Sequence, residues 1–180
     1  GQPTDKVNAG QEASVIVNQT PFYAESGGQA GDQGTLKSEN SAAMAVTNTL
    51  KKLGDMHVHV GEVQSGELAV GDIVHLAIDD RRRTKIRSNH SATHLLHEAL
   101  RRVLGDHVTQ KGSLVDESYL RFDFSHPKSM TGEEVKQAED IVNGVILSNH
   151  QVSTRLMTPD EAIEAGALAL FGEKYGDEVR

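Results

Sequence analysis

The feature that most constrains the fold is a change of residue pattern near residue 80. The chain before it contains short segments rich in valine, isoleucine and threonine, separated by glycine, aspartate and serine. These segments are residues 13–18, 34–37, 44–50, 57–63 and 72–79. Short β-prone runs between turn-forming residues are typical of closed antiparallel structures. We therefore expect a small antiparallel β-barrel over residues 1–85.

After the charged run at residues 79–87 the pattern becomes mainly helical, and we place a domain boundary within this run. Apolar spacing predicts a helix over residues 88–104, with Ser88 or Asn89 as its N-cap and Gly105 as its stop. Later segments predict strands at residues 108–114, 119–124 and 151–157, and helices at residues 131–149 and 159–165. Thr131 and Glu134 have the spacing of a capping box at the start of one of these helices. Helices that cover a small antiparallel sheet make residues 86–180 a second domain, and the chain as a whole an α+β protein.

Composition narrows the class of protein. The 180 residues carry a net charge of −8 and no cysteine. The negative charge argues against nucleic-acid binding by the whole surface, although it is compatible with a local basic patch. Without cysteine there are no disulfides, so a cytoplasmic location is the default, and no stretch approaches the roughly 20 apolar residues that span a membrane. The chain begins with Gly1 rather than methionine, and we expect it to be a piece of a longer protein.

Two histidines, His90 and His94, form an H-x-x-x-H pair within the predicted helix. Residues four apart lie on the same face of a helix, so both imidazoles can reach one metal ion, and imidazole is a favoured zinc ligand. The stripe that they form with His97 is separate from the apolar face of the helix. Spacing alone leaves a metal site and a solvated helix face equally open. Because Ser91 stands where a metalloprotease has its general-base glutamate, a protease mechanism is disfavoured. We expect His97 to support the metal ligands from behind or to pack, rather than to bind metal itself.

The other histidines give weaker signals. His57 and His59 share one face of a predicted strand and could chelate a metal, but a place on a surface strand is the expected role. We expect His107, His126 and His150 to be isolated, and either structural or solvent-facing.

Residues 20–34 form an unusual glycine-rich segment that contains Ser26, Gly27, Gly28 and Gln29. Adjacent glycines permit positive φ angles and let a backbone approach a ligand closely. From the residues alone, a bulged turn between strands is the favoured interpretation. The Gly-Gly-Gln triplet also occurs in peptide-release factors, but three residues are too few to carry an inference.

Several segments together closely resemble the editing region of bacterial alanyl-tRNA synthetases. These segments are residues 20–34, 87–102, 109–114, 120–126 and 167–175. They run in the family's order and cover essentially the whole chain, so as a set they are highly specific. Freestanding alanyl-editing proteins and the editing domain of threonyl-tRNA synthetase are similar in the core, but the resemblance to them is looser, notably at residues 171–175.

The resemblance implies a small β-barrel followed by an α/β editing core, which hydrolyses the ester of tRNA(Ala) mischarged with serine or glycine. It implies zinc on His90 and His94, with two further ligands in a C-x-x-x-H segment expected beyond Arg180. Structural zinc normally takes four protein ligands and catalytic zinc three, so without that segment the chain could bind metal poorly and be inactive. The family's ATP-dependent charging site would lie upstream of this piece.

The resemblance also implies that Thr93 and Gln110 are catalytic residues of the editing pocket, and that residues 26–29 contact the substrate there. Editing exists because a pocket for a small amino acid rejects a competitor that differs by one methylene or hydroxyl by only about 10–200-fold. An amide such as that of Gln110 both donates and accepts, so it could recognise a serine hydroxyl or hold water. Helix packing for Thr93 and solvent exposure for Gln110 remain open as alternatives.

The expected partners are the acceptor end of tRNA(Ala) and the rest of the parent synthetase. Arg81, Arg82 and Arg83 concentrate positive charge just before the predicted histidine helix, and contact with phosphates is a reasonable hypothesis for them. A charged linker between domains is an equally good interpretation. The alternative functions are a catalytically silent tRNA-binding module, a freestanding alanyl-editing protein or, if tRNA is not a substrate, an unrelated metal hydrolase.

Overall fold

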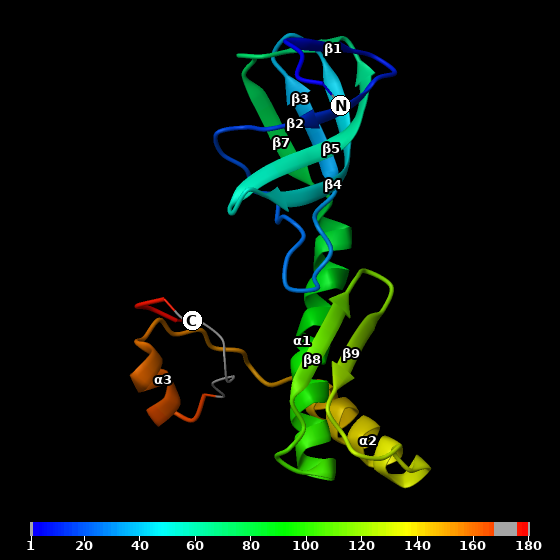
Figure 1. Cartoon of the computed structure of the whole chain (residues 1–180), viewed down its shortest axis with the longest axis vertical. Helices are drawn as coiled ribbons and strands as arrows, with labels where there is room; N and C mark the ends of the chain where they lie inside the picture. The colour runs from blue at the N-terminus through cyan, green and yellow to red at the C-terminus, as the bar shows by residue number, and fades with distance from the viewer. Residues whose placement is uncertain (1, 168–175, 180) are drawn as a thin grey trace. The chain divides into compact units, whose positions relative to one another are not determined.

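The computed structural model describes residues 2–167 and 176–179, and it is a mixed α+β structure, as expected. The chain forms two compact units, Gly1–Asn143 and Gly144–Arg180 (Figure 1). The similarity segment at residues 167–175 lies outside the described residues, apart from Ala167. Within the described ranges, no helix combines the length and the apolar character needed to cross a membrane.

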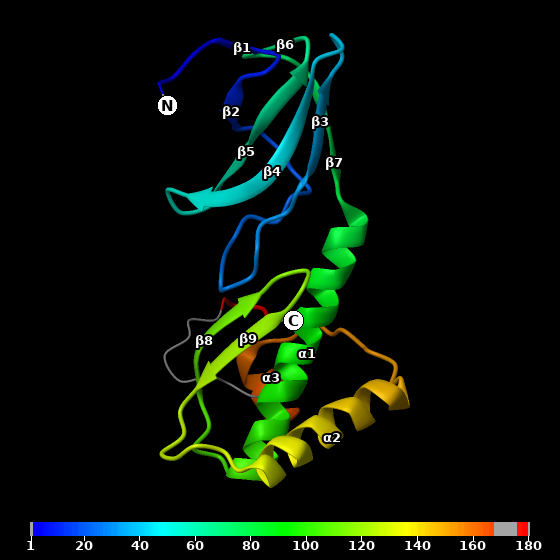
Figure 2. The ribbon, with the colours of Figure 1, turned by 90° about the vertical axis from the view of Figure 1, so that its right-hand side faces the viewer.

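The first unit begins with antiparallel strands (Figures 1 and 2). They are β1 (Lys6–Asn8), β2 (Glu12–Val15), β3 (Gly34–Ser38), β4 (Ala43–Lys52), β5 (Met56–Ser65), β6 (Glu67–Ala69) and β7 (Val74–Ile78). One five-stranded sheet has the order β2-β5-β4-β3-β7, and β1 pairs separately with β6. The strands predicted from the sequence are confirmed, because each coincides with a strand of the five-stranded sheet. The sequence did not predict β1 and β6, since a run of three residues is too short for alternation to show.

The prediction of a closed barrel is wrong for the described part of the chain. β2 and β7 are the two edge strands of the sheet, and no ladder joins them there. Residues 16–21, which follow β2, and residues 71–76, which include the first half of β7, instead line an open groove of about 850 Å³. A barrel closes only when both edge strands pair in register, and β2 and β7 do not pair among the described residues.

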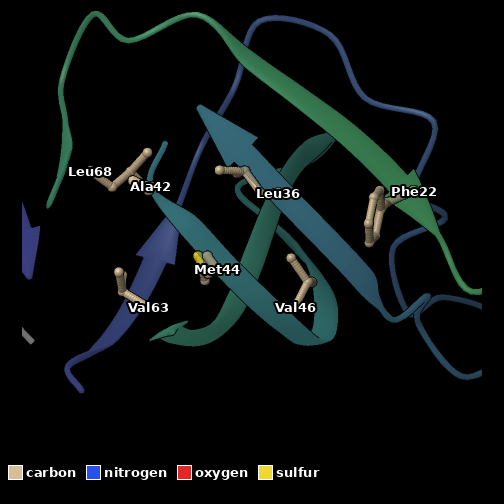
Figure 3. Close-up of a cluster of buried hydrophobic side chains, with 7 residues drawn as sticks. All are labelled: Phe22, Leu36, Ala42, Met44, Val46, Val63 and Leu68. Atoms are coloured by element: carbon tan, nitrogen blue, oxygen red, sulfur yellow. The ribbon is translucent and has the colours of Figure 1, made fainter. Parts of the chain in front are cut away.

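The sheet buries one face in a cluster of apolar side chains (Figure 3). Its buried members are Phe22, Leu36, Ala42, Met44, Val46, Val63 and Leu68. The central strands β3, β4 and β5 supply most of them, while Phe22 enters from the segment after β2. The pairing of β4 with β5 is irregular at Ala43/Met44 and at Val46/Asn48, and such bulges bend a strand and increase its twist. The sheet therefore curls around its own apolar face.

Helix α1 (Asp80–Leu104) begins well before the predicted start at Ser88. Its N-cap is Asp79, whose carboxylate accepts a hydrogen bond from the backbone N–H of Arg82 at 3.0 Å. The prediction was wrong because the first two turns are mostly charged and show no apolar stripe. The predicted end is confirmed, since Gly105 caps the helix with a φ of 113°. The arginine run is therefore part of the helix.

The rest of the first unit packs around a hairpin of β8 (Gln110–Val115) and β9 (Leu120–Phe124), which confirms two predicted strands. α1 lies along this hairpin, and α2 (Gly132–Ser148) follows it (Figures 1 and 2). The predicted capping box of α2 is confirmed, because the Thr131 and Glu134 side chains each accept from the other's backbone N–H, at 3.2 and 2.7 Å. A second apolar cluster buries Ala99, Leu100, Val108 and Ala138 against Phe122 and Phe124.

The second unit contains the short helix α3 (Pro159–Glu164), as predicted, with a capping box of Thr158 and Glu161. The predicted strand at residues 151–157 is wrong. Only Met157 pairs, in a single antiparallel bridge with Val179, and one bridge does not make a ladder. β-prone residues form a strand only where a neighbouring strand accepts them, and the described residues provide none here. The division into domains at residues 85 and 86 stays a prediction.

Candidate functional site

The paired histidines lie on α1 as predicted. The ring centroids of His90 and His94 are 5.1 Å apart and their planes differ by 16°, so the two imidazoles stack on one face of the helix. Burial, and then the nearby His94, lower the pKa of His90, which favours the neutral form that binds metals. Across residues 2–167 and 176–179, no group of three or more histidine, cysteine, aspartate or glutamate side chains could hold a metal ion. The described donor set is therefore two imidazoles.

The glycine-rich segment reaches this pair. The side-chain oxygen Oε1 of Gln29 lies 2.6 Å from Nδ1 of His90. The turn that carries Gln29 is closed by two backbone hydrogen bonds, since Gln29 N donates to Ser26 O at 3.0 Å and Ser26 N donates to Gln29 O at 3.3 Å. Two motifs that are far apart in the sequence thus meet at one place in the first unit.

The same turn docks on strand β8. Val115 N donates to Gly28 O at 2.8 Å, and Ala30 N donates to Val115 O at 2.9 Å. Gly28 has a φ of +84°, and a Cβ at this position would lie 2.1 Å from the carbonyl oxygen of Ser113. Gly27 also has a positive φ, of +58°, but nothing lies within 4 Å of its would-be Cβ. The interpretation as a turn between strands was incomplete, because the segment also packs against β8. This close approach requires glycine at residue 28.

Gln110 joins the glycine-rich segment through Ser113. Its Nε2 donates to Ser113 Oγ at 3.1 Å, and Ser113 Oγ donates to Gly27 O at 3.4 Å. The pairing of β8 with β9 is irregular between Gln110 and Gly112, and a bulge of this kind re-aims a side chain. The side chain of Gln110 is exposed, as the alternative interpretation expected, but it is not free.

Thr93 is buried, and its hydroxyl donates to the carbonyl oxygen of Asn89 at 2.8 Å. This contact matches the packing alternative for Thr93, and its role in a pocket stays a prediction. The sequence offered Asn89 as an N-cap, which is wrong because it lies inside α1. Its side-chain amide instead donates to Asp116 O at 2.7 Å and ties α1 to the end of β8, a role that sequence reasoning missed. Asparagine is disfavoured inside a helix. Once α1 is known to start at Asp80, the position of Asn89 inside the helix is a signal that its side chain has a specific partner.

Arg83 is committed to a buried ion pair with Asp32. Its Nε donates to Asp32 Oδ1 at 2.8 Å and its Nη2 contacts Oδ2, while the side chain of Asp32 is only 3% exposed. Asp32 also accepts from Tyr23 N at 2.6 Å. The Asp32 carboxylate holds the pKa of Arg83 above its ordinary value. Sequence reasoning missed the role of Asp32. A buried carboxylate needs a partner such as Arg83, but the burial of Asp32 is known only from the structure.

The other two arginines differ in their surroundings. Arg82 donates to Gly31 O at 2.7 Å and forms ion pairs with Glu117 and, at 3.6 Å, with Asp116. Arg81 is exposed and makes no ion pair with any described residue. Of the three arginines predicted to bind phosphate, Arg82 and Arg83 are therefore paired with carboxylates, and only Arg81 forms no ion pair with a described residue.

The expectation of a surface role for His59 is wrong. Its side chain is fully buried, with Nδ1 3.1 Å from Val15 O and Nε2 2.8 Å from Thr20 Oγ1. A carbonyl can only accept, so Nδ1 donates to it and Nε2 accepts from the hydroxyl. Both ring nitrogens are satisfied, and burial lowers the pKa of His59. His57 and His59 therefore do not form a chelating pair.

His107 and His126 are not isolated, contrary to expectation. His107 Nε2 lies 2.9 Å from His126 Nδ1 and the rings stack, because the loop before β8 and the end of β9 are neighbours in the hairpin. His150 is exposed. His97 packs, which is one of the two roles expected for it, because it is buried with its ring centroid 5.1 Å from that of Phe122. The expectation that its stripe is separate from the apolar face is wrong at His97, since Phe122 belongs to the second apolar cluster.

Comparisons with known proteins agree with this chain's motifs. Residues 1–82 match the family model described as tRNA synthetases class II (A). The whole chain is 64% identical to an alanine–tRNA ligase of Parvibaculum lavamentivorans, 59% to one of Bradyrhizobium diazoefficiens and 58% to one of Rhodopseudomonas palustris, over 20% of each protein. The chain thus spans about a fifth of the length of the curated relatives it matches. It belongs to the alanine–tRNA ligase family of class II tRNA synthetases.

Proposed function

We propose that this chain is the editing region of an alanine–tRNA ligase and that it removes serine or glycine from mischarged tRNA(Ala). The observation that carries the proposal is the contact between Gln29 and His90, with His94 stacked beside it. It joins the two segments whose residues most resemble the editing family. The names of the relatives support a role in the charging of tRNA with alanine.

The residues fit a zinc ion as part of its ligand set. His90 and His94 stack on adjacent turns, and the Nδ1 of His90 is occupied by Gln29, which leaves Nε2 for a metal. We propose that these two imidazoles hold zinc together with ligands from outside the described residues. When bound, zinc would supply Lewis-acid polarisation of the ester or of the attacking water.

The reaction itself is an ester hydrolysis. Water adds to the carbonyl carbon, the bond to the ribose oxygen breaks, and a proton passes to that oxygen, so free serine or glycine and uncharged tRNA result. Gln110 has donors and an acceptor with which to bind the serine hydroxyl or hold the water, and Ser113 restrains its amide. Thr93, which directly precedes His94, would border the pocket, and residues 26–29 would form its wall on the side of β8.

A tRNA-binding module without catalytic activity is the second candidate. The observation in its favour is that the described residues bring only two imidazoles together as metal ligands. In that case the exposed Arg81 would contact a phosphate and the histidines would be a structural feature of α1.

The two candidates separate in a deacylation assay with Ser-tRNA(Ala) and added zinc. We would assay the 180-residue chain alone and also the Parvibaculum lavamentivorans ligase in which this chain replaces the matching residues. We expect the grafted ligase to hydrolyse the ester and a His90→Ala variant to lose this activity. His75→Ala is the matched control, because His75 is exposed on β7, away from the site.

Hydrolysis by neither protein, with tRNA binding retained, would establish the silent module. Failure to bind tRNA in both settings would contradict both candidates. A fold check by circular dichroism for each variant separates loss of activity from loss of structure.

A further inference from the structure

The contact between Gln29 and His90 has a chemical direction. An amide oxygen can only accept a hydrogen bond, so the 2.6 Å contact of Gln29 Oε1 requires a proton on His90 Nδ1. In a neutral imidazole the other nitrogen, Nε2, then carries a lone pair. We propose that Gln29 is a positioning residue that holds His90 in the Nδ1-protonated tautomer and so presents Nε2 as a metal ligand.

The backbone around Gln29 makes this restraint firm. The turn is closed on itself between Ser26 and Gln29, and hydrogen bonds from β8 hold the residues on both sides of Gln29. Gly28 packs so closely on Ser113 that the turn cannot lift without breaking this contact. The segment that carries Gln29 is therefore fixed on β8, and this holds the Gln29 amide next to His90.

The partner imidazole lacks such a restraint. His94 is exposed, and none of the described residues forms a hydrogen bond with its ring nitrogens. Its ring is nearly parallel to that of His90, so it lies beside an imidazole whose orientation is already set. A hydrogen bond to the distal nitrogen of a ligating histidine fixes its tautomer and ring orientation, and its loss typically weakens metal binding by 10–100-fold.

The glycine-rich segment thus contacts His90 of the histidine pair, so its role need not be limited to binding substrate. The backbone N–H of Gln29 is used inside the turn and that of Ala30 is bonded to β8, so neither is available to a ligand. The part of this inference that concerns metal binding rests on the proposed function, whereas the tautomer of His90 does not.

The direct test is nitrogen-15 NMR of the histidine rings in the metal-free 180-residue chain, at a pH well above the ordinary histidine value of about 6.5. We expect wild-type His90 to carry its proton on Nδ1. Gln29→Met should release the ring to a mixture or to the Nε2-protonated form. Gln29→Glu should rescue the Nδ1 proton, because a carboxylate also only accepts.

Gln64→Met is the matched control, since Gln64 is exposed on β5 and bonds only to the nearby Glu62 backbone. Amide exchange of Val115 and Ala30 reports whether the turn stays docked in the Gln29→Met variant. A docked turn with an altered tautomer supports the positioning role. An Nε2-protonated His90 in the wild type, or no change in Gln29→Met, overturns it.

A second measurement isolates the metal. Competition with a chromophoric chelator gives the zinc affinity of the chain, and we expect Gln29→Met to lower it by about 10–100-fold, with Gln29→Glu restoring it. If the tautomer changes as expected and zinc affinity does not, the positioning of His90 stands and the zinc proposal fails. If neither changes, the positioning role fails whatever the deacylation assay finds.

Discussion

The two halves of α1 are held in different ways. The first half makes directed polar contacts with the glycine-rich segment and the hairpin, through Arg82, Arg83 and Asn89. The second half packs the apolar residues Ala99 and Leu100 against Val108, which precedes β8, and against apolar residues of β9 and α2. Directed polar contacts fix the positions of particular atoms, whereas apolar packing stabilises without specifying one partner atom.

The candidate site lies where these two kinds of contact meet. His90 follows the polar half and His97 begins the packed half. We therefore expect Arg82, Arg83 and Asn89, which make the directed polar contacts, to tolerate substitution poorly even when charge is kept. We expect the buried apolar positions Ala99 and Leu100 to tolerate a residue of similar volume.

Arg83→Met should lower the free energy of unfolding by about 3–5 kcal/mol, because it leaves the Asp32 carboxylate buried without its partner. Urea denaturation of the variant measures this loss. Arg81→Met on the same turns of α1 is the control, expected within about 0.5 kcal/mol of the wild type, since Arg81 is exposed. Equal effects at the two positions would contradict the assignment of a structural role to Arg83 alone. Adding Asp32→Asn to Arg83→Met should recover part of the loss.

Leu100→Ala should cost about 2–5 kcal/mol through lost burial and the cavity left behind, because Leu100 is 3% exposed. Leu100→Met, which conserves volume, should cost less than about 1.5 kcal/mol. Arg83→Lys is the counterpart in the polar half, and it should remain clearly destabilising because lysine cannot make the two-pronged contact with a carboxylate. Denaturation curves for these variants compare the tolerance of the two halves. If Arg83→Lys kept the stability of the wild type while Leu100→Met lost more than about 1.5 kcal/mol, the expected difference between the two halves of α1 would be reversed.

Gly28→Ala should destabilise the docked turn by more than Gly27→Ala. Both glycines have a positive φ, which costs a residue with a Cβ roughly 1–2 kcal/mol, but only at Gly28 would the Cβ meet the backbone of Ser113. Hydrogen exchange at the Val115 amide, which bonds to Gly28, measures the undocking. Equal exchange rates in the two variants would mean that the contact with β8 is not tight.

His59 extends the comparison to a polar contact inside the sheet. Its pKa is lowered by burial, so the folded chain keeps it neutral while the unfolded chain takes up a proton below about 6.5. Its stabilising contribution is complete above that value and is lost as the pH falls through the folded pKa. As the pH is lowered below about 6.5, the free energy of unfolding should fall less steeply in His59→Gln than in the wild type. His75→Gln on the exposed part of β7 is the control and should leave the slope unchanged.

Arg81→Gln should produce the smallest effect. If Arg81 contacts a phosphate of tRNA, the variant should bind tRNA a few-fold more weakly and the salt dependence of the affinity should lose about one unit of slope. Arg102→Gln is the control, because Arg102 is exposed late in α1 and pairs with Glu98. An unchanged slope for Arg81→Gln would remove the phosphate role.

Much of the local structure could be predicted because it depends on neighbours in the sequence. Gly105 ends α1 and the box of Thr131 and Glu134 starts α2, since both act within one helical turn. The three-residue strands and the start of α1 could not be predicted in this way. The first turns of α1 are held by Asp32 and by carboxylates of the β8–β9 turn, and these partners are distant in the sequence.

The candidate site divides along the same line. Helical spacing alone requires that His90 and His94 share a helix face, so this pair could be predicted without the structure. The contacts of Gln29 with His90, of Arg83 with Asp32 and of His107 with His126 arise from the packing of segments that are distant in the sequence. Periodicity is a property of a single element, whereas the partner of a polar atom depends on which elements pack together, and no local pattern encodes that choice.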